Sequence, residues 1–498
     1  MEALNHVLGL VQGGAGSLAA YLAAHVLLCL LPAFFVAGAL SALVPKEAVT
    51  RFLGPRAPKI VSYPAAALGG FVLAVCSCTI LPLFAGIHKK GAGLGPAITF
   101  LFVGPAINIL ALSYTGVALG MDIAVARLAL SILFGIGIGL IMALLFARED
   151  RARIALDDAG FGSGARVEGR VWLFLGLLLA VLIVGTLQVP LLTRSYGEVA
   201  LPVAGLDRVQ DALYLLVPFD AARGEEGVSV QGAGLIGLLG LIGVAAWRGL
   251  NRFDEGYTRW TWAALGLIAL TLVIAAVGVV PQAAGLTVRI TGKAIGVVAL
   301  LGALWWVGRR MFEAYEMQEF LWETWRFAKA IFPLLVVGVF AVGIVRQFIR
   351  PEWIEALAGS NNVLANLVGV LFGVFMYFPT LVEVPIANMF LGLGMHRGPL
   401  LAYLMADPEL SLQSILITAR VIGKTKAWVY VGWVALFSTL AGLLFGAWTD
   451  GAGLWAIGAY VAGGLALLGA ALGVAHILEG RRTPAAPAGE TSQSARSI

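Results

Sequence analysis

Long apolar segments separated by short polar connectors dominate the chain. Thirteen of them suit the roughly 20 residues with which a helix crosses the hydrocarbon core of a bilayer. They lie near 17–45, 60–87, 95–120, 122–147, 171–193, 231–248, 260–281, 290–307, 327–349, 362–390, 398–423, 426–447 and 453–478. The alternating pattern of a membrane β-barrel is absent, so an all-α polytopic membrane protein is predicted.

Glycine and proline recur at a constant offset of 303 residues inside these segments. The matched pairs are Gly70/Gly373, Pro82/Pro385, Gly91/Gly394, Gly95/Gly398, Pro96/Pro399, Leu101/Leu404, Pro105/Pro408 and Gly120/Gly423. Breaks in the helical backbone are therefore predicted at equivalent places in two repeats, 60–125 and 363–428. Paired, interrupted apolar segments of this kind are typical of secondary transporters that bind their substrate near the bilayer midplane.

The distribution of Lys and Arg indicates how many segments cross the membrane. If all thirteen cross, the positive charges divide about evenly between the two sides. If 60–87 and 362–390 are re-entrant hairpins instead, 24 of the 33 Lys and Arg share one side, against 9 opposite. The positive-inside rule then favours about 11 transmembrane helices plus two hairpins, with the N-terminus outside and the C-terminus in the cytoplasm. Seven crossings separate equivalent helices, so the repeats are predicted to be inverted.

This topology predicts five regions. They are a first repeat (1–147), a connector with four accessory helices (148–326), a second repeat (327–447), a last transmembrane helix (448–478) and a disordered tail (479–498).

Composition excludes several classes of protein. The chain is 60% hydrophobic and 12% charged, about half the charge of a soluble domain. Its net charge of +5 lies in short loops, which argues against nucleic acid as a partner. Neither a Walker A lysine motif nor a zinc-spaced His/Cys cluster is present, so no cofactor and no enzymatic activity are expected. The expected partners are the lipid bilayer and a small-molecule substrate, and a homo-oligomer stays open.

The densest chemical signal is the sequence CSCTILP, in the middle of the first hairpin. It comprises Cys76, Ser77, Cys78, Thr79 and Pro82. On a continuous helix residues i and i+2 point apart, but a break lets two thiols converge. A helix restarting at Pro82 would direct its positive N-terminal end at them and favour thiolates, which select soft ions. The alternative is that both cysteines pack between helices.

A second break is predicted at GPAIN, residues 104–108. Pro105 removes a backbone donor, and Asn108 follows it as a polar side chain at membrane depth. These two residues are expected to line the substrate site. The alternative is a simple proline kink with an asparagine that joins neighbouring helices.

The second repeat replaces the thiols with acids. Thr380 stands opposite Ser77 and is a candidate for substrate binding, and Glu383 stands opposite Ile80. Asp407 and Glu409 flank Pro408 at the other break. Carboxylates inside a membrane are commonly proton relays, so all three are candidates for proton coupling.

Two of these acids have a structural alternative, in which Asp407 caps the following half-helix and Glu409 lies in its first turn. Glu383 has no such alternative. No Lys or Arg is near it in sequence, the closest downstream being Arg397, and it is expected to be unpaired.

The motifs CSCTILPL, GPAITFL and GPAIN resemble the ArsP-type permease family, also described as predicted permeases. The likeness is dense over 60–125 and weaker over 365–425, and the four extra helices from 171 to 307 depart from it. Its best-understood members export trivalent organoarsenicals across the bacterial inner membrane. The resemblance implies that Cys76 and Cys78 form the thiol pair that binds a soft metalloid substrate, not a structural metal ion.

Together these observations predict an inner-membrane secondary transporter for efflux of a thiophilic metalloid compound, coupled by proton antiport. Methylarsenic(III) has two exchangeable positions, which two thiolates satisfy. Copper(I) and mercury(II) stay open as soft alternatives. One alternative function is a permease for a small anion or a sulfur compound. Another is a membrane thiol oxidoreductase in which Cys76 and Cys78 cycle as a disulfide.

Overall fold

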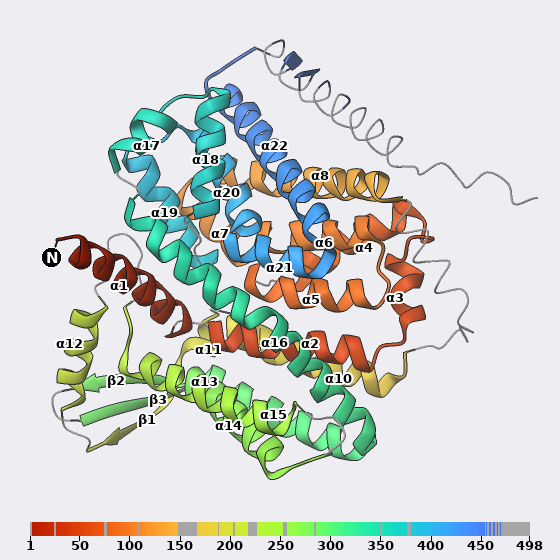
Figure 1. Ribbon diagram of the computed structural model, residues 1–498, viewed down its shortest axis with the longest axis vertical. Coiled ribbons are helices and arrows are strands. Elements are labelled where there is room, and N and C mark those ends of the chain that lie inside the picture. The colour runs from red at the N-terminus through yellow and green to blue at the C-terminus, as the bar shows by residue number, and fades with distance from the viewer. Residues whose placement is uncertain are drawn as a thin grey trace, which may run out of the picture.

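The computed structural model describes residues 2–23, 26–73, 77–107, 109–147, 167–187, 189–202, 205–217, 227–251, 256–282, 285–348, 351–375, 380–453 and isolated positions within 455–469. Nearly all of them are helical (Figure 1). Seven described helices are long and apolar enough to cross a membrane: α8 (Met121–Leu145), α10 (Gly169–Thr186), α13 (Val230–Gly249), α14 (Arg259–Ala276), α15 (Gly292–Met311), α16 (Ala314–Val345) and α22 (Lys424–Thr449). A pair bent by 46°, α20 (Arg397–Leu410) and α21 (Leu412–Ile422), makes up to eight.

Shorter helices complete the two repeats. The first repeat contains α4 (Lys59–Leu73), α5 (Ser77–Lys89), α6 (Leu94–Ala106) and α7 (Ile109–Ala118). Their counterparts are α18 (Val363–Phe375), α19 (Thr380–Gly392), α20 and α21. The other described helices are α1 (Glu2–Ala23), α2 (Val26–Ala42), α3 (Lys46–Leu53), α11 (Pro190–Thr193), α12 (Leu206–Leu216), η3 (Arg346–Phe348) and α17 (Pro351–Ala358).

Helix bounds recur at the offset seen in the sequence. α5, α6, α7 and α8 each begin 303 residues before α19, α20, α21 and α22. The turns between them recur as well. Gly91 and Gly394 have φ of 92° and 89°, and Gly120 and Gly423 have φ of 116° and 92°. Because side chains rarely adopt such positive φ angles, the turns themselves require these four glycines.

The helices of both predicted hairpins are short. α4, α5, α18 and α19 have 13 to 15 residues. At 1.5 Å per residue they reach about 20–23 Å, less than the ~30 Å hydrocarbon core, so none crosses alone. The expectation that a helix restarts at Pro82 is wrong, since α5 begins at Ser77 and contains Pro82. In the second turn a proline removes only one backbone hydrogen bond, so the helix continues through it.

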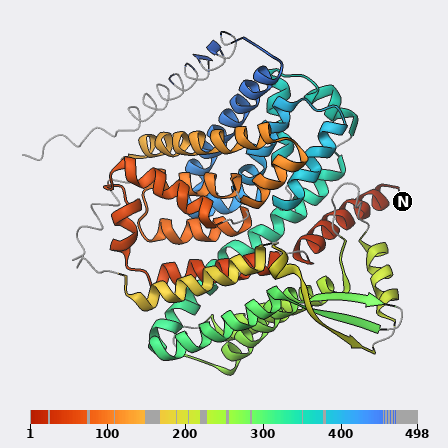
Figure 2. The ribbon, with the colours of Figure 1, turned by 180° about the vertical axis from the view of Figure 1, so that it is seen from behind.

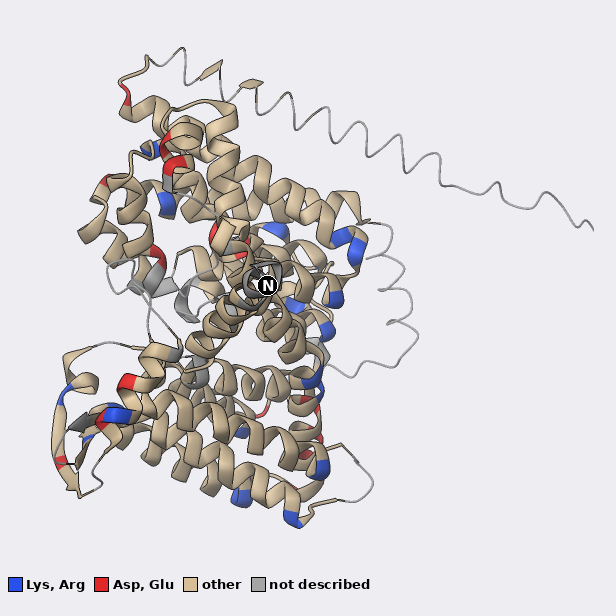
Figure 3. Ribbon diagram, turned by 60° about the vertical axis from the view of Figure 1, so that its left-hand side comes forward, with Lys and Arg blue, Asp and Glu red and all other residues tan. Residues whose placement is uncertain are grey.

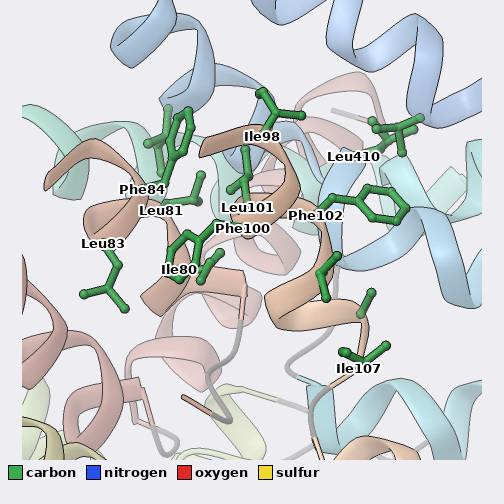
Figure 4. Close-up of a cluster of buried hydrophobic side chains, with 14 of the residues drawn as sticks. Ile80, Leu81, Leu83, Phe84, Ile98, Phe100, Leu101, Phe102, Ile107 and Leu410 are labelled. Carbon is green, nitrogen blue, oxygen red and sulfur yellow. The ribbon is translucent and has the colours of Figure 1, made fainter. Parts of the chain in front are cut away.

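Glycine pairs set the crossing points inside each repeat. A Cβ on Gly139 of α8 would lie 2.6 Å from the carbonyl oxygen of Gly95 on α6. A Cβ on Gly442 of α22 would lie 2.6 Å from that of Gly398 on α20. Such contacts exclude any side chain, so these glycines let α6 and α20 pack directly on the long helices. Every residue of α6 is buried, and Figure 4 shows its Phe100, Leu101 and Phe102 in the surrounding apolar cluster.

The two repeats meet along α8 and α22. Phe134 and its counterpart Phe437 contact each other, with ring centroids 4.8 Å apart. Lys426 at the start of α22 lies over the ring of Phe146, which follows the end of α8, at 5.5 Å. α8 and α22 therefore run antiparallel. Shorter helices pack crosswise, α5 against α21 and α19 against α7.

The four accessory helices form a layer below the repeats in Figure 1, with α2 and α16 between. A small antiparallel sheet of order β1-β3-β2 caps one end (Figure 2). Its strands are β1 (Ser195–Leu201), β2 (Gly278–Gln282) and β3 (Gly285–Thr291). The all-α prediction is wrong here, because β1 pairs with a strand about 90 residues away and no local pattern announces it.

Two ends of the chain differ from the expected spans. The first apolar run, 17–45, contains the end of α1 and all of α2, which are separate helices. Much of the predicted last helix, 448–478, and the whole tail lie outside the described residues.

Gly139→Ala should destabilise the protein by roughly 1–3 kcal/mol, because the added methyl group collides with the backbone of α6. Gly137→Ala, two residues earlier, is the matched control. Its nearest neighbour is a Phe437 ring atom at 3.9 Å, so its effect should stay within about 0.5 kcal/mol. Thermal unfolding in detergent measures both. Equal midpoints for the two variants would contradict the assigned crossing.

Candidate substrate site at the helix breaks

The structure places the predicted thiol motif at the start of α5. Cys76 lies outside the described residues, and Ser77 and Cys78 are the first two residues of α5. Thr79, the next residue, is fully buried. The described residues contain no group of three or more His, Cys, Asp or Glu that could hold a metal ion.

The other predicted site residues lie at the two helix breaks. Pro105 is buried in the last turn of α6, and Asn108 lies outside the described residues. Thr380 is the first residue of α19. In the second repeat α20 ends at Leu410, and Ser411 caps α21 by accepting from the Ser414 backbone N–H at 3.4 Å.

Arg127 organises the break in the first repeat. It lies on α8, its side chain is fully buried, and its Nε donates to the Ala106 carbonyl oxygen at 2.9 Å. This carbonyl ends α6 and has no intrahelical donor, because the helix stops there. The guanidinium thus sits at the negative end of the α6 dipole, where a cation is stabilised. A further contact joins Nη1 to the Thr115 hydroxyl at 3.5 Å.

The sequence led us to expect an unpaired Glu383, and the structure contradicts this expectation. Its two carboxylate oxygens each lie 3.0 Å from Nη2 of Arg127, and both side chains are fully buried. Glu383 lies on α19 of the second repeat, so this ion pair joins the two repeats. Removing either partner leaves an uncompensated charge in an apolar interior.

The equivalent positions in the second repeat hold different groups. Tyr430 is the counterpart of Arg127 and Glu409 that of Ala106, at the same offset of 303. The Tyr430 hydroxyl donates to Oε2 of Glu409 at 2.6 Å. The same repeat position therefore contacts the end of the broken helix in both repeats. In the first repeat it is a guanidinium that donates to a backbone carbonyl, and in the second it is a phenol that donates to a carboxylate.

Asp407 and Glu409 do not cap the half-helix that follows them. Asp407 lies inside α20, and Glu409 is in its last turn. The cap of α21 is Ser411, because α20 continues past Pro408 to Leu410. The backbone of Asp407 packs on Gly373 of α18, whose Cβ would lie 2.8 Å from the Asp407 nitrogen.

The charges around the breaks do not balance. Glu383, Asp407 and Glu409 are buried carboxyl groups, and Arg127 is the one buried guanidinium that the described residues place with them. A carboxylate in the last turn of α20 also opposes the helix dipole. Glu409, whose described partner is the neutral Tyr430 hydroxyl, would carry an uncompensated charge when ionised, and a proton or a cationic ligand can neutralise it.

Sequence reasoning missed Arg127 and Tyr430. An arginine five residues into the apolar run 122–147 was the available signal, because a charge inside a span is by default functional. Tyr430 carries no such signal and becomes visible only by applying the repeat offset to Arg127.

Comparison with known proteins finds one matching family profile and related sequences. The profile of a family described as predicted permease matches residues 12–447. UPF0718 protein MJ0584 of Methanocaldococcus jannaschii is 30% identical over 447 residues, covering 90% of this chain and 98% of that protein. UPF0718 protein YraQ of Escherichia coli is 25% identical over 118 residues, or 24% of this chain and 34% of that protein. No solved structure matches the chain.

Arg127→Met should destabilise the protein by about 3–5 kcal/mol, because Glu383 is left buried without its partner. The double variant Arg127→Met/Glu383→Leu should recover most of this loss, since neither charge remains. Arg397→Leu is the control. It breaks an ion pair with Asp122 whose side chains are 38% and 31% exposed, and should lower stability by about 1 kcal/mol or less. Thermal unfolding in detergent measures all three, and a double variant no better than Arg127→Met would contradict the pairing.

Proposed function

The chain belongs to the ArsP-type family of predicted permeases, and from this premise we propose that it is a secondary transporter that exports a thiophilic metalloid compound by proton antiport. One observation carries the proposal. Two broken helices, related by a sequence repeat, have buried titratable groups beside their breaks, within apolar segments that suit a bilayer. Free backbone and charge are tolerated there only inside protein or beside a watery cavity, which is where transporters bind their substrates.

Several contacts support an inverted arrangement of the repeats. α8 and α22 are equivalent helices that run antiparallel, with Phe134 facing its own counterpart Phe437. Arg397 begins α20, as Leu94 begins α6, yet it pairs with Asp122 at the far end of the α6–α7 unit, at 2.6 Å. A two-fold axis in the membrane plane produces both contacts, and such an axis allows one fold to open to either side.

Contacts among basic loops support the proposed orientation. The topology with two hairpins and the positive-inside rule assign seven segments to the cytoplasmic side: 46–59, 88–94, 148–170, 248–259, 308–329, 420–426 and the C-terminal tail. The structure joins the first five of them through Gly93 N–H to the Leu53 carbonyl (2.7 Å), Lys89 with Glu323, Arg170 with Glu316 (2.8 Å) and Lys329 with Asn251 (2.6 Å). Figure 3 shows a row of Lys and Arg along this edge. The proposal accordingly has the N-terminus outside and the C-terminus in the cytoplasm, in a bacterial inner membrane.

The thiol motif supports a soft substrate. Cys76 and Cys78 flank the start of α5, where a helix N-terminus favours thiolates. Two thiolates satisfy the two exchangeable positions of a trivalent monoorganoarsenical, which makes that class the preferred cargo. Glu383, Asp407 and Glu409 supply carboxyl groups for the counter-transported proton. Arg127 holds the ionised form of Glu383 in place.

A second candidate function is a permease for a small anion, and Arg127 favours it. A fully buried guanidinium lies beside the break that precedes α7 and contacts the first turn of α19. Helix N-termini and arginine together suit an anionic group. A permease for a small anion needs no thiol. Transport by variants without Cys76 and Cys78 therefore distinguishes the two candidate functions.

Replacing Cys76 or Cys78 by Ser should abolish the export activity, which is measured as uptake of methylarsonous acid into inside-out vesicles. A hydroxyl keeps the volume of the side chain but loses affinity for soft ions. Uptake into inside-out vesicles with and without a pH gradient measures both the rate and the proton coupling. Cys29→Ser, on α2, is the matched control and should transport normally.

An undiminished rate in the double variant Cys76→Ser/Cys78→Ser would overturn the thiol site. A rate that ignores the pH gradient in the wild-type protein would overturn proton antiport.

The inverted arrangement predicts opposite labelling of equivalent loop positions. Ala57→Cys and Ser360→Cys, 303 residues apart, are introduced singly into a cysteine-free background. A membrane-impermeant maleimide applied to intact cells should label residue 360 only, because residue 57 faces the cytoplasm. Labelling of both positions, or of neither, before the cells are permeabilised would instead make the repeats parallel.

A further inference from the structure

Gln413 has a buried side-chain amide, and no described hydrogen bond to its oxygen explains its presence. It is the second residue of α21, and it is 1% exposed. Its Oε1 has no hydrogen-bond partner among the described residues. The α16 backbone lies against it at Gly338, whose Cβ would be 2.6 Å from the Gln413 Cβ. An amide oxygen buried without a hydrogen-bond partner opposes folding, so its presence requires an explanation.

A second unused acceptor lies just across the break. Oε1 of Glu409 is buried and has no described hydrogen-bond partner, while Oε2 receives the Tyr430 hydroxyl. Glu409 and Gln413 are four residues apart, on either side of the 46° bend at Ser411. Two buried acceptors without described hydrogen-bond partners therefore flank the same bend. Ser411 lies between these two residues in sequence, and Ser414 directly follows Gln413. The Ser411 hydroxyl donates a hydrogen bond of 2.7 Å to the Ser414 hydroxyl.

The helix that carries Gln413 contacts the first repeat. α21 packs against α5, the helix that begins with Ser77 and Cys78. In the first repeat the residue equivalent to Gln413 is Leu110, and that equivalent to Glu409 is Ala106. The scaffold therefore does not require polar groups at these two positions.

We propose that Glu409 and Gln413 form a hydroxyl-binding subsite, which holds the neutral, hydroxylated form of the substrate before its central atom reaches the thiols. The carboxylate accepts one substrate hydroxyl. The Gln413 amide, which can both donate and accept, takes a second one. A ligand that pairs groups left unpaired by the fold gains selectively over analogues that lack its hydroxyls.

The inference rests on the proposed function and explains its coupling. A dihydroxy metalloid exchanges each hydroxyl for a thiol: one metalloid–sulfur bond forms, and one water leaves with the thiol proton and the displaced hydroxyl. Before that exchange the hydroxyl donates more strongly to an ionised Glu409 than to a protonated one, because a charge-assisted hydrogen bond is the stronger one. Proton and substrate therefore compete for Oε1, and this competition is what an antiporter requires.

The test compares two probes on the purified full chain in nanodiscs. Methylarsonous acid carries two hydroxyls on a thiophilic atom. Methylboronic acid carries two hydroxyls but has no affinity for thiols, so its binding reports the subsite alone. The variants are Gln413→Met, which keeps the volume and removes the amide, and Ile415→Met, a control on the same helix. Binding is measured by saturation-transfer NMR and calorimetry, and ligand-free stability by thermal unfolding.

Gln413→Met should weaken methylboronic acid binding roughly 2- to 12-fold, the equivalent of one hydrogen bond. Its ligand-free unfolding midpoint should be equal to or above that of wild type, because a buried amide oxygen without a partner has been removed. Ile415→Met should change neither quantity. A lowered midpoint for Gln413→Met would show that the amide bonds to the protein, and would overturn the subsite. Unchanged or undetectable binding of methylboronic acid to wild type and variant would overturn it as well.

The thiol variant separates this inference from the proposed function. If Cys76→Ser/Cys78→Ser binds methylarsonous acid as tightly as wild type, the thiophilic site fails. The subsite still stands in that case, provided that Gln413→Met weakens both probes.

Discussion

Charge buried in hydrocarbon must be neutralised locally, and the contact between Arg127 and Glu383 meets this constraint at the point where the two repeats join. The guanidinium is held on one side by the last carbonyl of α6 and on the other by a carboxylate of α19. Neither residue is stable in this environment without the other. The position of α19 relative to α8 is therefore tied to the end of a broken helix, which cannot extend without displacing the arginine.

The repeats share a scaffold and divide the chemistry. Glycines with positive φ, crossing glycines and prolines near the breaks recur because they shape the backbone. Side chains at the breaks do not recur: the first repeat holds the thiols and a guanidinium, and the second holds carboxyl groups and a phenol. The shared glycines and prolines give both repeats the same backbone geometry. Different side chains at the breaks give each repeat different chemical groups. The proposed site between them would combine soft and hard donors, which one repeat alone does not supply.

Sequence patterns predicted the backbone better than the contacts. The breaks near Pro105 and Pro408 and the short hairpin helices follow from glycine and proline, whose effects are local. The ion pair of Arg127 with Glu383 joins residues 256 apart in sequence, so no local pattern could indicate it. The sheet escaped prediction for the same reason. Gln413 and Tyr430 were missed because a single polar residue on an apolar helix carries no signal until its neighbours are known.

The pair between Asp122 and Arg397 has no counterpart under the repeat symmetry, since the equivalent residues are Thr425 and Leu94. Exchange of conformations between symmetric halves would give two states of equal free energy. Asp122 and Arg397 form a partly exposed ion pair that the equivalent residues cannot form, and such a pair contributes about 0.2–1 kcal/mol. If the repeats exchange conformations as proposed, this pair alone makes the populations of the two states differ by up to about fivefold at rest, and the transporter then has a preferred conformation before any substrate binds.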